Sequence, residues 1–333
     1  EQGKTIIMNN ANAAREPASE ALIDIRGLSK RFGSEQVLTN VDLSVAHGDS
    51  LVLIGGSGSG KSLLLKCIVG LVAPTSGSIW IDGQDAAGMR ASERRAFERR
   101  FGMLFQRQGL FDSMTVWENV AFRLLQDRDL SRSDARDIAD DKIRSVGLGV
   151  EVGDLYPAEL SGGMQKRVGF ARAIATDPDI LFLDEPTAGL DPVARQEFWR
   201  LLETLRDGGR LTVVVSTHLL DEADRADRVA ILHEGQMLVC DDPKALRRQL
   251  GQEILTLSCD DAEALKGEIN RAMGLEGIVV DQALRIPLDG DVSLDEVLRL
   301  FRPKIRSLTI AHPSLDDVFI RHTGERLLGG FTN

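Results

Sequence analysis

A glycine-rich segment is the first part of the sequence whose residue types and spacing suit a defined chemistry. It reads Gly55-Gly56-Ser57-Gly58-Ser59-Gly60-Lys61-Ser62 and matches the pattern G-x-x-x-x-G-K-[ST] in full. The glycines allow backbone N–H groups to turn inward around phosphate oxygens, and a following helix N-terminus adds positive partial charge. Lys61 can reach the β- and γ-phosphates of a nucleotide, and the Ser62 hydroxyl can bind Mg²⁺. The alternative, a glycine-rich turn without a ligand, is disfavoured because an apolar strand precedes the loop and a helical pattern follows it.

Two adjacent carboxylates end another apolar stretch, Ile180 to Leu183. In a nucleotide site, Asp184 would hold Mg²⁺ through water, and Glu185 would orient or deprotonate the attacking water. Taken alone, the two residues fit a solvated acidic strand end equally well. The phosphate loop in the same chain favours the catalytic interpretation.

A second candidate anion site begins at Ser161. The run Leu160-Ser161-Gly162-Gly163-Met164-Gln165 opens a predicted helix. Ser161 can cap this helix and leave the N–H groups of Gly162 and Gly163 free for an anion. A single ATP cannot need both this site and the phosphate loop of one chain unless the fold brings them together.

The elements that must position these residues alternate between strand and helix. Apolar strands are predicted over 51–54, 180–183 and 212–216, with helices over 61–70 and 192–206. This order predicts a mainly parallel sheet with helices on both faces.

Shorter strands are expected around that sheet. Before it we expect short antiparallel strands with turns at Gly33 and Asn40, and a hairpin-like strand before Asp82. Residues 91–160 are helical and charged in pattern, and a final hairpin closes the first domain. The strand segments are 22–25, 28–32, 37–45, 79–81, 229–232 and 236–239.

A second unit follows, with the order strand, helix, strand, strand, helix, strand, which is the ferredoxin-like pattern. Ser293 and Glu296 have the spacing of a capping box at its second helix. This unit shows no catalytic constellation. Its segments are 253–258, 262–273, 277–280, 283–288, 293–301 and 305–310.

Composition narrows the functional classes. The chain has 333 residues and a formal net charge of −11, which argues against a nucleic-acid-binding face. Its three cysteines are scattered, so a metal cluster or a disulfide framework is not expected. No stretch approaches the ~20 apolar residues of a membrane span, so a membrane partner would have to be another chain.

The motifs together resemble the ATP-binding cassette family, in which Leu160 to Gly163 is the signature motif. The resemblance implies an α/β P-loop NTPase cassette, with an antiparallel β-subdomain and a helical subdomain, followed by a small α+β ferredoxin-like domain. We expect a disordered tail over 1–20, the cassette over 21–243 with its helical subdomain at about 91–170, and a C-terminal accessory domain over 250–333.

The resemblance also assigns further residues. Gln106 matches the glutamine that senses Mg²⁺ and the permease, and His218 matches the switch histidine at the γ-phosphate. Asp191 ends a D-loop that crosses the dimer interface, although Gly189 departs from the commoner serine-containing form. Phe32 falls where the family places an aromatic ring on adenine, and the alternative is an ordinary core aromatic.

The implied assembly contains two copies around two ATP and Mg²⁺, with Ser161, Gly162 and Gly163 of one copy facing the γ-phosphate of the other. A separate integral-membrane permease would hold it at the cytoplasmic face of the inner membrane, with or without a substrate-binding subunit. No nucleic acid partner is expected.

The sequence resembles the ATPases of two types of transporter, so the type to which this chain belongs is left open. Residues 105–122 and 155–160 resemble the ATPases of Mla-type and Mce-type lipid transporters, whereas 217–223 and 313–319 resemble ATPases of drug, polysaccharide and lipid exporters. Lipid transport is preferred because, in the family that the chain resembles, the first region faces the permease. There Phe111, Met114, Val116 and Trp117 could seat a permease helix, and the alternative is that they are ordinary core residues. A soluble non-transport ABC ATPase and a nucleotide-binding module without hydrolysis are the remaining alternatives.

Overall fold

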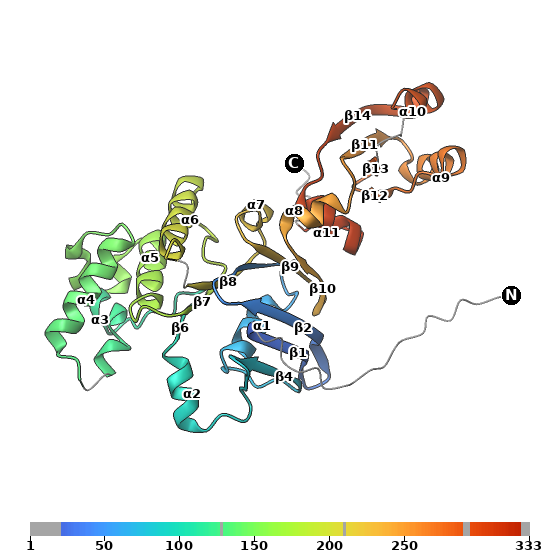
Figure 1. Cartoon of the computed structure of the whole chain (residues 1–333). Coiled ribbons are helices and arrows are strands. Elements are labelled where there is room, and N and C mark those ends of the chain that lie inside the picture. Colours follow the sequence, from blue (N-terminus) through green and yellow to red (C-terminus); the bar gives the residue numbers. More distant parts are fainter. Residues whose placement is uncertain (1–20, 127–128, 209–210, 289–293, 328–333) are drawn as a thin grey trace.

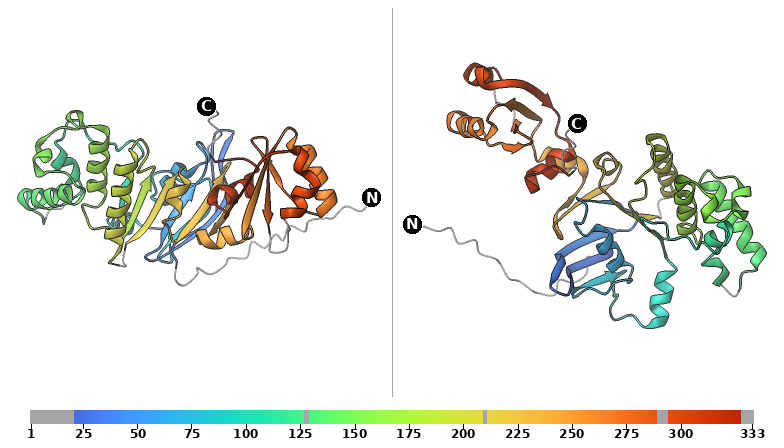
Figure 2. Two further views of the ribbon diagram at one scale, coloured as in Figure 1. Left: turned by 90° about the horizontal axis from the view of Figure 1, so that it is seen from above. Right: turned by 180° about the vertical axis from the view of Figure 1, so that it is seen from behind.

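The computed structural model describes residues 21–126, 129–208, 211–288 and 294–327. A central sheet has a helical unit at one end and the C-terminal unit at the other, and a smaller antiparallel sheet packs beneath it (Figure 1). The views from above and behind show the same separation of the two end units (Figure 2). In the described residues, no helix is both long enough and apolar enough to span a bilayer. The predicted tail over 1–20 and Ser293 lie outside the described residues.

The central sheet has the strand order β10-β9-β3-β8-β7-β6. All neighbouring pairs are parallel except the β9–β10 hairpin, which confirms the predicted mainly parallel sheet. Its strands are β3 (Ser50–Ile54), β6 (Phe101–Leu104), β7 (Ile180–Asp184), β8 (Thr212–Thr217), β9 (Arg228–His233) and β10 (Gln236–Asp241).

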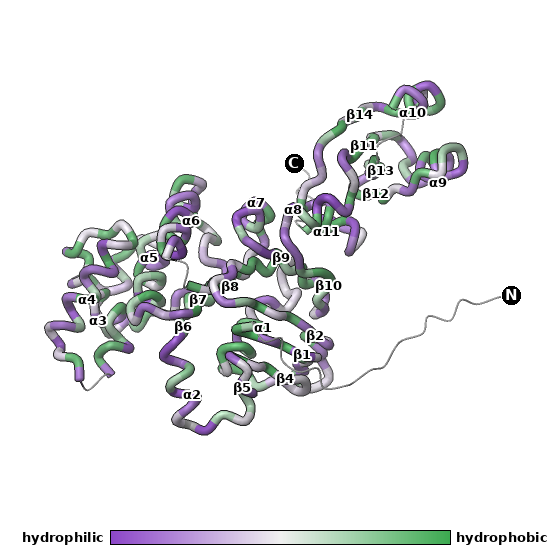
Figure 3. The backbone as a smooth tube through the Cα atoms, viewed as in Figure 1, coloured by the Kyte–Doolittle hydropathy of each residue, from purple (hydrophilic) through white to green (hydrophobic). Residues whose placement is uncertain are grey.

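Both faces of this sheet are covered, because side chains alternate between two cores. Leu53 and Phe182 pack toward α1 (Lys61–Ile68) and the small antiparallel sheet. Leu181 and Val215 pack on the opposite face with α5 (Gly162–Ala173) and α6 (Pro192–Arg206). Hydrophobic colouring accordingly follows α1 and the inner strands, while α2 (Ala91–Glu98) is mainly hydrophilic (Figure 3).

The small antiparallel sheet differs from its prediction in where its strands break. β1 (Ala21–Phe32) and β2 (Glu35–Ala46) are each continuous, and they join β4 (Ser76–Ile81) and β5 (Gln84–Asp85). The predicted turn at Gly33 is confirmed, with φ +57° between β1 and β2. The predicted turn at Asn40 is wrong. Its φ of 50° marks an irregularity inside β2, next to a shift in register between Leu28 and Lys30.

The helical unit contains α3 (Val116–Val120), α4 (Arg132–Ser145) and α5, which pack on one another (Figure 1). β6 falls between α2 and α3, so the segment 91–170 also supplies the edge strand of the central sheet.

The C-terminal unit has the strand order β12-β13-β11-β14, with every pair antiparallel, as a ferredoxin-like unit requires. Its elements are β11 (Glu253–Cys259), α9 (Ala262–Met273), β12 (Ile278–Val280), β13 (Ala283–Leu288), α10 (Leu294–Phe301) and β14 (Ile305–Ala311). The chain then forms α11 (Leu315–Thr323), which the sequence analysis did not predict. This helix packs against α7 (Leu220–Ala223) and α8 (Pro243–Arg248) of the first domain.

Candidate functional site

The glycine-rich segment forms a loop between β3 and the N-terminus of α1, where the carboxyl edge of the parallel sheet lies. Gly58 and Gly60 have φ of +80° and +104°, a region that suits glycine. A Cβ on Gly55 would lie 2.1 Å from the carbonyl oxygen of Leu232, so only glycine fits there. The loop is therefore held closely against β9, and α1 begins without a side-chain cap on its N–H groups.

Lys61 curls back over this loop and is almost fully buried. Its Nζ donates to the carbonyls of Gly55 at 2.7 Å and Gly56 at 3.0 Å, and lies 3.8 Å from Oε1 of Glu185. Burial lowers the pKa of Lys61, and the neighbouring Glu185 and Asp184 oppose that shift. The ammonium thus sits among acceptors that a phosphate can replace.

Ser62 and Asp184 meet across the ends of α1 and β7. The Ser62 Oγ donates to Asp184 Oδ1 at 2.8 Å, and the Ser216 Oγ donates to the same oxygen at 2.6 Å. A hydroxyl and a carboxylate form the hard oxygen donor set that Mg²⁺ prefers together with nucleotide phosphates. The residues present therefore fit a magnesium ion, and Ser216 is a contact that the sequence analysis missed. Its signal was a polar side chain inside a buried strand.

Glu185 follows directly and adopts an unusual backbone conformation. Its φ is +51°, and its N–H donates to the carbonyl of Ser216 at 3.0 Å. Nδ1 of His218 lies 2.6 Å from Glu185 Oε2. The arrangement can hold a carboxylate base beside the phosphate loop with its orientation fixed by an imidazole.

Gln106 and Phe32 are both exposed. Gln106 follows β6 on the edge where β7 ends, and it is exposed. Phe32 ends β1 with 52% of its surface exposed, and Nζ of Lys30 lies 4.8 Å from its ring centroid. An exposed ring suits stacking on a base better than the core role considered as its alternative.

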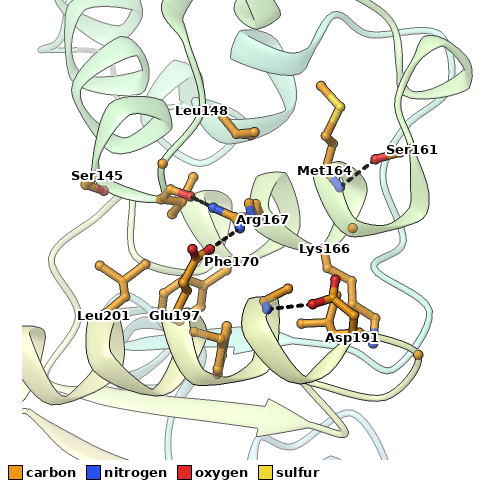
Figure 4. Close-up of a pocket in the computed structure, with 17 residues that line it drawn as sticks. Ser145, Leu148, Ser161, Met164, Lys166, Arg167, Phe170, Asp191, Glu197 and Leu201 are labelled. Atoms are coloured by element: carbon orange, nitrogen blue, oxygen red, sulfur yellow. Dashed lines mark hydrogen bonds and ion pairs between the residues drawn. The ribbon is translucent and has the colours of Figure 1, made fainter.

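The signature residues line a different cavity, of about 850 Å³, between α5, the end of α4 and α6 (Figure 4). The Ser161 Oγ accepts from the N–H of Met164 at 3.3 Å and so caps α5. Ser161, Gly163 and Asp191 line this cavity, and no phosphate-loop residue does. Gly162 is exposed, and a Cβ there would meet no described atom within 4 Å.

Asp191 is engaged within its own chain. Its Oδ1 accepts from the N–H groups of Val193 at 2.9 Å and Ala194 at 3.0 Å, which caps α6. These backbone hydrogen bonds lower the pKa of Asp191. Lys166 donates to the carbonyl of Ala188, so the signature helix is tied to the D-loop that precedes Asp191.

The phosphate loop, the carboxylates beside it and the mainly parallel central sheet together define a phosphate-loop nucleotide hydrolase. The family model for ABC transporter matches residues 38–188. The glutamine transport ATP-binding protein GlnQ of Escherichia coli (strain K12) is 39% identical over 226 residues, which cover 68% of this chain and 93% of GlnQ. This chain belongs to the ABC transporter ATP-binding subunits and is an ATPase.

The chain is also similar to a plant protein and to a solved ATP-binding cassette. The protein TRIGALACTOSYLDIACYLGLYCEROL 3, chloroplastic, of Arabidopsis thaliana is 37% identical over 241 residues, which cover 67% of this chain and 69% of that protein. The dimeric structure of the ATP-binding cassette MJ0796 in a post-hydrolysis state bound to ADP and Pi has a TM-score of 0.62 and 31% identity. It covers 66% of this chain and 98% of that one.

Proposed function

We propose that two copies of this chain close around two ATP molecules and thereby drive a separate membrane permease to which they bind peripherally. The observation that carries this proposal is the separation of the two anion sites. The phosphate loop lies with Asp184 and Glu185, whereas Ser161 and Gly163 line a cavity to which no described phosphate-loop residue contributes. A second copy supplies the missing half of each site, and the proposal is supported by the similar cassette MJ0796, which is dimeric in its structure with ADP and Pi.

Within each site, different residues of the chain bind the nucleotide, hold the metal ion and activate water. Lys61 and the loop N–H groups bind the phosphates, Ser62, Asp184 and Gln106 hold Mg²⁺, and Phe32 stacks on the adenine. Mg²⁺, when bound, neutralises charge that develops on the phosphates. Glu185 accepts a hydrogen bond from the attacking water and draws its proton, while His218 fixes the Glu185 carboxylate and faces the γ-phosphate. The partner's Ser161, Gly162 and Gly163 complete the phosphate cradle, and the Asp191 cap holds the D-loop at the interface.

Replacing Glu185 by Gln tests this assignment. The amide keeps the shape of the site but cannot take a proton, so we expect ATP to bind and hydrolysis to fall by about 100-fold or more. The variant should form an ATP-dependent dimer that elutes at twice the monomer mass. Turnover at the wild-type rate would refute the role of Glu185.

For the cargo, we propose a lipid. Residues 105–122 resemble lipid-transporter ATPases. Phe111, in the segment that follows the edge strand β6, is 43% exposed. The side chain of Asn119 forms hydrogen bonds with the backbone of Phe111 and Met114. These bonds hold the backbone of this segment in place, which suits the docking of a permease helix. A relative named after the glycolipid trigalactosyldiacylglycerol supports the same class. Val116 and Trp117 are buried in the core, so they cannot contact the permease helix. Phe111 and Met114 are the two residues of the segment that we expect to contact it.

Export of a drug, polysaccharide or lipid precursor is the second candidate, favoured by the resemblance of 313–319 to exporter ATPases. Purification of the tagged chain from its own membranes, with identification of bound proteins and lipids, separates the two. A permease with a substrate-binding subunit and phospholipid supports lipid transport. A six-helix permease alone supports export.

The ferredoxin-like unit, part of the accessory domain at 250–333, is proposed to regulate or stabilise the dimer. It carries none of the site residues, and α11 packs against α7, which begins two residues after His218. Deletion of residues 252–333 with unchanged dimerisation, activity and complex assembly would refute this role.

A further inference from the structure

One buried carboxylate next to the site has no part in the chemistry described above. Glu222 lies on α7, four residues after His218, and its side chain is 1% exposed. The hydroxyl of Thr187 donates to Oε1 of Glu222, and the hydroxyl of Thr217 donates to Oε2 at 2.7 Å. Both oxygens of the carboxylate therefore accept a hydroxyl hydrogen bond.

The two threonines belong to the two segments that carry the catalytic pair. Thr187 comes two residues after Glu185, in the turn where the N–H of Ala188 donates to the Glu185 carbonyl at 3.2 Å. Thr217 directly precedes His218, and its Oγ1 also accepts from the N–H of Leu219 at 3.1 Å. Glu222 thus bridges the chain after Glu185 to the chain around His218.

A cation balances the buried charge only partly. Nε of Arg195, on the first turn of α6, lies 3.9 Å from Oε1 of Glu222 and is buried without a hydrogen-bond partner among the described residues. Burial of a carboxylate is costly unless hydrogen bonds and a counter-charge compensate. A charged acceptor holds two hydroxyls more strongly than an amide oxygen does, because charge-assisted hydrogen bonds are about twice as strong as neutral ones.

We propose that Glu222 is a positioning residue that keeps the imidazole of His218 aligned with the carboxylate of Glu185. The inference rests on the proposed function of that pair. Glu185 holds a φ of +51° that the surrounding structure must enforce, and the Glu222 bridge fixes the segment immediately after it. Loss of the bridge lets either segment shift, and a shift of about 1 Å in a reacting group can cost 10²-fold in rate.

The test uses the purified full-length chain and steady-state hydrolysis of Mg·ATP. Glu222→Gln keeps the volume of the side chain but cannot hold both hydroxyls as a charged acceptor. We expect kcat to fall about 30-fold with KM for ATP changed less than about 2-fold, because the phosphate loop is untouched. Thr187→Val, which removes one donor without changing shape, should lower kcat about 10-fold.

Asp221→Asn is the matched control. Asp221 is the neighbouring residue on α7, is 73% exposed, and lies 3.8 Å from Arg195. It changes the charge near Arg195 without touching the bridge, so we expect wild-type kcat and KM.

A double substitution separates positioning from a general structural role. In a His218→Ala background the bridge has no imidazole to align, so adding Glu222→Gln should lower kcat by less than about 3-fold. An equal loss in both backgrounds would overturn the proposal, as would an unchanged kcat in the single variant. A fall in melting temperature with an unchanged kcat would show a purely structural carboxylate and would overturn it too. If His218→Ala itself hydrolyses ATP at the wild-type rate, the assignment of the catalytic pair fails instead.

Discussion

Nδ1 of His218 lies 2.6 Å from Oε2 of Glu185, and the two residues stand at the ends of adjacent strands, β8 and β7. The second oxygen of the same carboxylate lies 3.8 Å from Nζ of Lys61. One carboxylate is therefore held between an imidazole and the ammonium of the phosphate loop. These two contacts fix the orientation of the Glu185 carboxylate, which is the proposed base.

His218→Ala should lower kcat for ATP hydrolysis about 100-fold, because the Glu185 carboxylate loses the group that orients it. KM for ATP should change less than about 3-fold, since the phosphate loop does not depend on His218. Steady-state hydrolysis checks both values. His47→Ala, at a side chain that is 61% exposed, serves as the control and should behave as wild type. A rise in KM of the same size, with kcat unchanged, would show that His218 contributes only to the binding of ATP.

The thiol of Cys67 gives a prediction for stability against pH. Cys67 is 2% exposed on α1, and burial raises its pKa from an ordinary 9.0 to about 11, opposed by the charge of Lys30. Between these values the unfolded chain has lost the thiol proton and the folded chain keeps it. The unfolded state binds fewer protons there, so the free energy of unfolding falls as pH rises.

The loss attributable to Cys67 is about 2 to 3 kcal/mol once the pH passes the folded pKa. Urea unfolding of the wild type and of Cys67→Ala at pH 8 and pH 10.5 measures the part of this loss that occurs below the folded pKa, which is about 2 kcal/mol. The wild type should lose more stability than the variant over this interval. Equal losses in the two proteins would contradict the shifted pKa.

Local patterns predicted the parallel sheet and the phosphate loop because both depend on short stretches of sequence. The run of Ile180 to Leu183 is buried throughout, and Gly60 needs its positive φ whatever surrounds it. The Glu222 bridge could not be predicted, since Thr187 is 35 residues away and meets Glu222 only through tertiary packing. The helix α11 did carry a local signal. Ser314 and Asp317 form a capping box at its start, with the spacing that was used elsewhere in the sequence.

Phe319 on α11 should be a main anchor of the C-terminal unit. It is 1% exposed, belongs to the same core as α7, and its ring centroid lies 6.0 Å from that of His233. Phe319→Ala should reduce the free energy of unfolding by about 3 to 5 kcal/mol and speed proteolysis between α8 and β11. Leu300→Ala, at a side chain that is 47% exposed, is the control and should cost less than about 1 kcal/mol. Denaturant unfolding measures both, and similar values would contradict the anchoring role.

Gly55 should tolerate no side chain, because a Cβ there would lie 2.1 Å from the carbonyl oxygen of Leu232 and 2.6 Å from the Ser59 hydroxyl. The backbone of β9 cannot move without disturbing its pairing with β3, so the phosphate loop must shift instead. Gly55→Ala should therefore lower the stability of the nucleotide-free chain by about 1 to 3 kcal/mol.

Gly56→Ala is the matched comparison for stability, since a Cβ at that position meets no described atom within 4 Å. Its melting temperature without nucleotide should stay within about 2 °C of the wild type, whereas Gly55→Ala should melt at least about 4 °C lower. Gly55→Ala should also bind ATP at least about 10-fold more weakly in a fluorescence titration, because the displaced loop no longer directs its N–H groups at the phosphates. Wild-type stability and affinity in Gly55→Ala would mean that the loop has another conformation open to it, one that leaves room between Gly55 and β9.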